Sequence, residues 1–231
     1  DIVISMVTDD AASKSVWLTP ETGAVYGLRA GAIAIESSTL SVDYTQELEQ
    51  IFAGRGFDFL IAPVVGSRPQ AEAQRLIYLV GGNADILAKA QPVLSINSGT
   101  IYHLGSAAQV MAMKLAVNSL LGIQVAALAE ALGLLSQYGL SLETAANCLV
   151  EMPVVSPAAK GATAAIVADS HAPLFPIQLV EKDFRYAMKA GKKVQADMPV
   201  VDVARQRFEK AIAQGYGDEN ISAVARLYGS F

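Results

Sequence analysis

Short apolar runs alternate with helical patterns over the first hundred residues of the chain. Each run has four to six residues, and the runs cover Ile2–Val7, Ala32–Ile35, Phe57–Ile61, Leu76–Val80 and Ile101–Leu104. Helical patterns lie between the runs, at about 9–18, 42–53 and 83–92. Short strands that alternate with helices predict an α/β fold built on a parallel, doubly wound sheet.

The pattern changes after Gly105. One long helix is predicted from Ser106, which can cap its start, to Tyr138, where Gly139 ends it. Further helical patterns follow at about 142–150, 156–168, 177–193, 199–214 and 219–228. The sequence therefore predicts an α/β domain over residues 1–105 and an all-α domain over residues 106–231, with the long helix joining them.

Composition narrows the possible functions. The chain has 231 residues, 52% apolar and 17% charged, with a net charge of −5. The high apolar and low charged fractions exclude a disordered chain. The negative charge provides no basic surface, so we expect neither a nucleic acid nor a membrane as a partner. The single cysteine, Cys148, and two histidines predict no disulfide and no metal site, and they suit a reducing, cytoplasmic compartment.

The most apolar stretch, Ala107–Ala129, has the length of a membrane span. Polar residues interrupt it; they are Gln109, Lys114, Asn118, Ser119 and Gln124. Because a spanning helix needs about 20 nearly uniform apolar residues, this pattern predicts a buried helix of a soluble protein. A helix that is apolar around most of its circumference needs cover on every side, so we expect a homodimer or homotetramer.

Lys114 is the only charged residue between Ala90 and Ala129. Asn118 lies four residues later, so the two side chains project from one helix face about one turn apart. A buried ammonium is costly unless it is paired or functional, and desolvation favours the neutral amine that a general base needs. The alternative is a lysine whose stem is buried while its ammonium reaches the surface. The residues alone leave both interpretations open.

Two loops follow predicted strands, at the sheet edge where open α/β folds bind ligands. The first is Ser37-Ser38-Thr39, which could instead cap the next helix. The second is residues 62–67, where Gly66 leaves backbone N–H groups available to an anion. An ordinary turn would have the same sequence pattern. Lys182 lies in an amphipathic helix, where an exposed lysine is the simpler interpretation.

Several short motifs occur in a characteristic order. They are Ser38-Thr39, Ala62-Pro63-Val64-x-Gly66, Gly81-Gly82, Lys114-Leu115-Ala116-x-Asn118, Lys182-Asp183 and Gly217-Asp218. Their order and spacing resemble the β-hydroxyacid dehydrogenases, the group that includes 3-hydroxyisobutyrate dehydrogenase, tartronate semialdehyde reductase and the glyoxylate/succinic semialdehyde reductases. The resemblance covers essentially the whole chain.

The resemblance implies a Rossmann domain that binds NAD or NADP, an all-α domain, a small carboxylate or semialdehyde substrate, and dimers or tetramers. It implies that Lys114 is the catalytic general acid/base and that Asn118 holds the substrate. The other substrate-binding positions would be Ser38, Val65, Gly66 and Ser67. The cofactor-binding positions would be Val7, Thr8, Thr39 and Lys182.

The sequence departs from the family pattern in three places. Val65 replaces the serine whose hydroxyl helps to bind the substrate carboxylate, and Ser67 could supply a replacement. Val7-Thr8 stands where the family has Leu-Pro. The Gly-x-Gly-x-x-Gly turn that seats a pyrophosphate does not occur in the sequence. Since Asp1 directly precedes an apolar run, we expect an N-terminal part of the fold to lie before it.

These departures leave alternatives to the dehydrogenase. One is a non-catalytic scaffold or cofactor-sensing relative of the same fold, although a scaffold has no evident use for Lys114. Another is an imine-reducing relative, a group that generally lacks a lysine at this position.

Overall fold

The computed structural model describes residues 1–229, which divide into two compact units. The division falls between Val117 and Asn118, inside the long helix α5 (Ala107–Gln137), whereas the sequence pattern placed the domain boundary at 105/106.

The first unit is built on a mixed sheet. Its strands are β1 (Ile2–Ser5), β2 (Ile33–Glu36), β3 (Asp58–Ile61), β4 (Val64–Val65), β5 (Leu76–Gly82) and β6 (Ser98–Gly105). β1, β2 and β3 are parallel neighbours, as predicted. β5 runs antiparallel to both β3 and β4, and β6 lies parallel to β5 on its other side.

The prediction of a wholly parallel sheet is therefore wrong for β5 and β6. The cause is the connection between β3 and β5, which contains only the two-residue β4 and the short helix α3 (Arg68–Glu72). A parallel neighbour needs a crossover that returns the chain to the starting edge, usually through a full helix. Here the short connection turns the chain back, so β5 pairs with β4 in the opposite direction.

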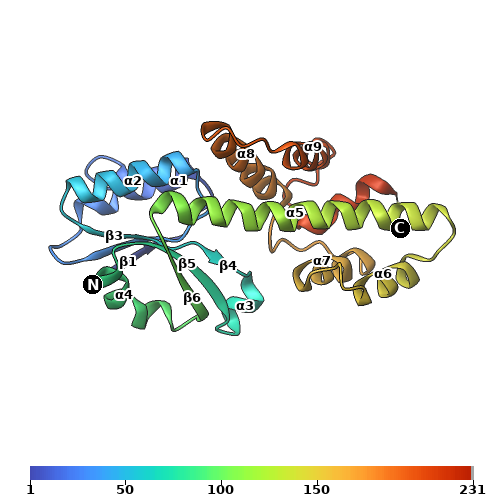
Figure 1. Cartoon of the computed structure of the whole chain (residues 1–231), viewed down its shortest axis with the longest axis horizontal. Helices are drawn as coiled ribbons and strands as arrows, with labels where there is room; N and C mark the ends of the chain where they lie inside the picture. Colours follow the sequence, from blue (N-terminus) through green and yellow to red (C-terminus); the bar gives the residue numbers. More distant parts are fainter. Residues whose placement is uncertain (230–231) are drawn as a thin grey trace. The chain divides into compact units, whose positions relative to one another are not determined.

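Helices cover both faces of this sheet (Figure 1). They are α1 (Asp10–Leu18), α2 (Val42–Gly54) and α4 (Ala84–Leu94), with a short 3₁₀ segment, η1 (Ala24–Tyr26). α1 and α2 lie on one face and α4 on the other (Figure 1). The α/β class predicted from the alternating pattern is confirmed.

Successive residues of each strand alternate between these two faces. Phe59 stacks on Phe52 of α2 with ring centroids 4.6 Å apart, and Phe52 meets Trp17 of α1 edge-on at 5.2 Å. On the opposite face, Leu60 and Ile35 pair across the strands and belong to the cluster that includes residues of α4. Such alternation follows from the two-residue period of a strand.

The second unit is all helical beyond the shared helix α5. Its elements are α6 (Leu142–Glu151), α7 (Pro157–Val167), α8 (Ile177–Lys193), α9 (Pro199–Ala213) and a 3₁₀ segment, η2 (Ile221–Tyr228). Within residues 118–229 no extended strand forms, and Pro176 and Asn220 make an isolated β-bridge. The predicted all-α region is confirmed, although its last segment is a 3₁₀ rather than an α-helix.

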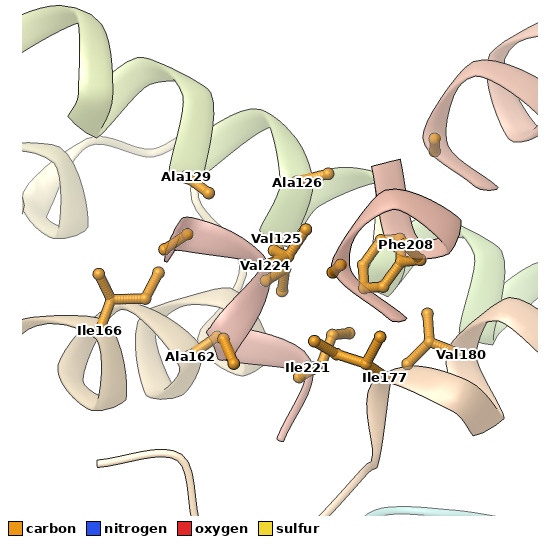
Figure 2. Packing of buried hydrophobic residues seen from close by; sticks show 14 of the residues in the cluster. Val125, Ala126, Ala129, Ala162, Ile166, Ile177, Val180, Phe208, Ile221 and Val224 are labelled. Carbon is orange, nitrogen blue, oxygen red and sulfur yellow. The ribbon is translucent and has the colours of Figure 1, made fainter. Parts of the chain in front are cut away.

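The core of the second unit gathers side chains from its helices and η2. Figure 2 shows Val125 and Ala129 of α5 near Val224, with Ile177 of α8 and Phe208 of α9 in the same cluster. Gly122 allows α8 to approach α5, because a Cβ on Gly122 would lie 2.5 Å from the ring of Phe184. Gly133, the other glycine inside the predicted long helix, is a packing position too, because a Cβ there would lie 2.8 Å from Tyr228 Cβ.

α5 is long and apolar enough to cross a membrane when judged by length and composition alone. The core helices of soluble proteins meet the same criteria, and α5 contributes Val125, Ala126, Ala129 and Leu132 to the core of the second unit.

Candidate functional site

The carboxyl ends of the parallel strands β1, β2 and β3 meet at one edge of the sheet in the first unit. The loop after β1 joins the loop after β2 there, because the Val7 N–H donates to Ser38 Oγ at 2.7 Å. Ser38 is buried, whereas Thr39 is partly exposed and Thr8 is exposed. The accessible hydroxyls at this edge are therefore those of Thr8 and Thr39, and Ser38 supports the loops that carry them.

The start of α5 contacts the same edge. The Leu40 N–H donates to Met111 Sδ at 3.4 Å, and both residues are buried. Lys114 lies three residues after Met111, and therefore on the same helix face one turn on. Lys114 is only 8% exposed, so most of its side chain is buried. The first unit thus brings the Thr39 loop and the Lys114 segment together.

The predicted substrate loop is placed by β4 and α3. Val65 belongs to β4, and Ser67 stands at the N-cap of α3, where its N–H donates to Gln70 Oε1 at 2.9 Å. Gly66 has a φ of +120°, and a Cβ there would lie 2.9 Å from Leu76 Cδ2. The glycine is required by both its backbone conformation and its packing.

The second unit contains a buried polar group around Asp183. Asn118 Nδ2 donates to Asp183 Oδ2 at 2.6 Å, and Lys182 Nζ lies 3.2 Å from Asp183 Oδ1. Lys182 Nζ also lies 5.2 Å from the centroid of the Tyr186 ring. Lys182 and Asp183 are 6% and 2% exposed, so the sequence-based alternative of an exposed Lys182 is wrong.

Asp183 is the residue to which the sequence analysis assigned no role. An amide that donates its NH₂ to a carboxylate turns its carbonyl oxygen away from that carboxylate. Asp183 therefore selects one orientation of the Asn118 side chain, and Lys182 balances the charge of Asp183. The adjacent Lys-Asp pair in an amphipathic helix was the available signal, but its partner Asn118 is 65 residues away in sequence.

Two family models match the chain. Residues 1–105 match the NAD binding domain of 6-phosphogluconate dehydrogenase, and residues 107–228 match the model described as NAD-binding of NADP-dependent 3-hydroxyisobutyrate dehydrogenase. The chain belongs to the β-hydroxyacid dehydrogenase family. The resemblance inferred from the motifs is thereby confirmed.

Named relatives span the same region. The chain is 32% identical to 2-(hydroxymethyl)glutarate dehydrogenase of Eubacterium barkeri over 99% of its own length and 76% of that protein. It is 30% identical to glyoxylate/succinic semialdehyde reductase 1 of Arabidopsis thaliana, over 96% of this chain and 76% of that one. These β-hydroxyacid dehydrogenase relatives are named as dehydrogenases and reductases, so the chain is a member of an NAD(P)-dependent enzyme family.

Solved structures agree on the fold. A 3-hydroxyisobutyrate dehydrogenase from Mycobacterium tuberculosis, described with L-serine, has a TM-score of 0.85 at 27% identity and covers 99% of this chain and 79% of that chain. A 3-hydroxyisobutyrate dehydrogenase from Salmonella typhimurium has a TM-score of 0.91, covering 98% and 79%, and at 22% identity it supports the fold alone.

The sheet edge has the chemistry to hold the nicotinamide end of a dinucleotide. The hydroxyls of Thr8 and Thr39 and the backbone amides of their loops are donors and acceptors suited to a carboxamide and a ribose. These residues of the β-hydroxyacid dehydrogenase fold therefore fit that end of the cofactor. The part of the cofactor that needs a glycine-rich turn has no matching motif in this sequence.

Proposed function

We propose that this protein interconverts a small β-hydroxyacid and its semialdehyde by hydride transfer with NAD or NADP, and that Lys114 is the general acid/base. The burial of Lys114 at the start of α5 carries the proposal. A lysine in that position can exchange a proton with a bound substrate while apolar neighbours keep water away. The contact between Leu40 and Met111 supports it, because it holds this turn of the helix beside the Thr39 loop.

Each side chain has a separate task in this reaction. The bound cofactor supplies the hydride for reduction and accepts it in oxidation. During reduction, the Lys114 ammonium donates a proton to the carbonyl oxygen as the C–H bond forms at the carbonyl carbon. During oxidation, neutral Lys114 accepts the hydroxyl proton. Asn118 hydrogen-bonds the substrate, and Asp183 holds its amide in one orientation.

The cofactor-side contacts would come from the carboxyl edge of the sheet. Thr8 and Thr39 are the accessible side chains there, with Val7 contributing backbone and Ser38 holding the two loops together. Lys182 is buried against Asp183, so its contribution would be electrostatic and would pass through that pair.

The substrate would carry a carboxylate. The two relatives described above are named for 2-(hydroxymethyl)glutarate and for glyoxylate or succinic semialdehyde. The Gly66 backbone N–H and the Ser67 hydroxyl are the donors that remain in the loop where Val65 lacks a hydroxyl. The similarity to named enzymes favours this reaction over a non-catalytic scaffold.

Turnover by Lys114 variants of the full-length protein tests the proposal, with a panel of small semialdehydes as substrates. Lys114→Ala is expected to lower kcat by about 10²–10⁴-fold, the usual contribution of general acid/base catalysis. Lys114→Arg keeps a positive charge but cannot exchange a proton near neutral pH, so it should be nearly as slow. Lys89→Ala is the matched control, because Lys89 is 65% exposed. A decrease of less than about tenfold for Lys114→Ala would contradict the role.

Thermal unfolding with NADH and NADPH separately tests the cofactor. A ligand that binds only the native state adds about 2.7 kcal/mol at a hundredfold excess over Kd. Stabilisation by one of the two would identify the preferred cofactor. No stabilisation by either would favour the scaffold.

Self-association would cover the exposed apolar face of α5. Within the second unit, Leu120 and Leu134 are 65% and 59% exposed and lie on one face, since they are separated by about four turns. We expect a dimer or tetramer in detergent-free buffer, measured by light scattering, and a shift towards monomer in Leu120→Glu/Leu134→Glu. A stable wild-type monomer would contradict this expectation.

A further inference from the structure

Glu36 is a completely buried carboxylate at the carboxyl end of β2. Its Oε2 accepts hydrogen bonds from Ser13 Oγ at 2.5 Å and from the Trp17 indole N–H at 2.8 Å. Its Oε1 accepts the backbone N–H of Ser38 at 2.8 Å. All three donors are neutral groups. A carboxylate held by several hydrogen bonds in the interior fixes the position of every donor, because each would lose its acceptor if it moved.

The donors come from two different parts of the first unit. Ser13 and Trp17 belong to α1, whereas Ser38 belongs to the loop after β2. Ser38 continues the network, since its Oγ accepts the Val7 N–H from the loop after β1. One carboxylate therefore connects α1 to both loops of the sheet edge.

A second carboxylate reinforces the same connection. Asp10, in the first turn of α1, accepts the Ser41 N–H at 2.8 Å and the Ser41 hydroxyl at 2.6 Å. Ser41 caps α2 directly after the Thr39 loop. The loop that carries Thr39 is therefore held at both ends, by Glu36 through Ser38 and by Asp10 through Ser41.

We propose that Glu36 is a positioning residue for the nicotinamide end of the cofactor, acting through Ser38 to hold the Thr8 and Thr39 loops in a binding-ready arrangement. This proposal rests on the proposed function, because it requires that these two loops contact NAD or NADP. Glu36 itself is too deep to touch a ligand. Its effect is to reduce the ordering that the loops must undergo when the cofactor binds.

Glu36→Gln changes the network with little change in side-chain shape. Glutamine has one acceptor oxygen, and its NH₂ would face an N–H or O–H donor, so at least one of the three hydrogen bonds is lost. Cofactor dissociation constants for NADH and NADPH should rise about tenfold, measured by calorimetry on the full-length protein. Ser38→Ala removes the acceptor of the Val7 N–H and should also raise the cofactor dissociation constants. It replaces Glu36→Gln in the test if that variant folds poorly.

Ser13→Ala is the matched control. It removes a hydrogen bond to the same carboxylate from the α1 side but leaves the link through Ser38 to the loops intact. Its cofactor Kd should stay within about twofold of wild type even if its Tm falls as far as that of Glu36→Gln. Trp17 is the only tryptophan in the chain and donates to Glu36, so a change in its emission reports that the network has been altered before any cofactor is added.

The outcomes are distinct. An altered Trp17 emission with an unchanged cofactor Kd in Glu36→Gln overturns the positioning role, as does an equal loss of affinity in Ser13→Ala. A wild-type protein that binds neither NADH nor NADPH overturns the proposed function, and the role of Glu36 with it. Weaker binding in Glu36→Gln and Ser38→Ala but not in Ser13→Ala supports the role.

Discussion

Glu36 and Asp183 are buried carboxylates, one in each unit, and their surroundings differ in charge. Glu36 accepts hydrogen bonds from a hydroxyl, an indole and a backbone amide, all neutral. Asp183 accepts from the Asn118 amide and lies 3.2 Å from the Lys182 ammonium. Both are adjacent to residues of the candidate site.

The difference shows that a buried carboxylate can be accommodated in two ways. Enough hydrogen-bond donors compensate for lost hydration without any counter-charge, as at Glu36. A cation also compensates for it, as at Asp183, but the cation is then buried too and depends on the carboxylate. Removal of the carboxylate should therefore have different consequences in the two units.

Asp183→Ala should cause the largest loss of stability. It removes the counter-charge next to the buried Lys182 ammonium and the acceptor of the Asn118 amide. Breaking a buried ion pair in this way typically costs about 3–5 kcal/mol of unfolding free energy. Urea unfolding followed by far-UV circular dichroism measures it. Lys182→Met/Asp183→Leu, which removes both charges, should recover part of the loss, and a double variant as unstable as Asp183→Ala would contradict the charge argument.

Glu36→Gln should cost less, about 1–2 kcal/mol of unfolding free energy, because only neutral donors lose an acceptor and no charge is left behind. Trp17 emission during urea unfolding follows the first unit, since Trp17 lies in α1. Glu47→Gln on the exposed side of α2 is the control and should change stability by less than about 0.5 kcal/mol. A cost for Glu36→Gln equal to that of Asp183→Ala would show that the two carboxylates are not held differently.

His171 lies between α7 and α8 in the second unit and is 9% exposed. We expect it to give a smaller, pH-dependent change in stability. Burial is the main cause that lowers its pKa below 6.5, and Arg226 lowers it further, while Asp169 and Glu219 oppose the shift. A histidine whose folded pKa is depressed favours the neutral form, so its stabilisation is present above pH 6.5 and is lost as the pH falls below that value.

The Tm of the wild type should therefore decrease more steeply below pH 6.5 than the Tm of His171→Asn. Above that pH the two profiles should run parallel. An identical slope in both proteins would assign the acid sensitivity to carboxylates instead.

The smallest effect is expected at the surface. Lys89 and Asp58 form an ion pair at 3.5 Å with the lysine 65% exposed. Lys89→Ala should change the unfolding free energy by less than about 1 kcal/mol, because solvent and salt screen exposed pairs. A loss of unfolding free energy comparable to that of Glu36→Gln would contradict the argument that Glu36 and Asp183 affect stability because they are buried.

Local signals account for the parts of the fold that were predicted correctly. The start of α1 was predicted at about residue 9, where the side chain of Asp9 accepts the Ala12 N–H three residues later. The start of α2 was predicted at residue 42, but its cap is Ser41, which accepts the Tyr44 N–H, and not the Ser37-Ser38-Thr39 run that the sequence offered. Capping depends on residues within one turn, which the sequence displays directly. The direction of a strand is not determined by residues within one turn. The antiparallel β5 was missed because an apolar run has the same pattern in either direction.

The candidate site also contains features that the local sequence displays and features that it does not. Lys114 stood out in the sequence because a charge in a long apolar stretch is unusual, but the sequence left its burial open and the structure decided it. The tasks of Glu36 and Asp183 were not visible there. The side chains that hold Glu36 lie up to 23 residues away, and Asn118 is 65 residues from Asp183.

The sequence by itself determined the α/β and all-α halves, the long helix, the family and the candidate catalytic position Lys114, because periodicity and motif order are encoded in neighbouring residues. Only the tertiary structure decided the direction of β5, the burial of Lys182 and the partners of the two carboxylates. A buried polar group is stabilised by whichever donors the fold brings to it, and those donors are distant in sequence and specified only when the chain packs.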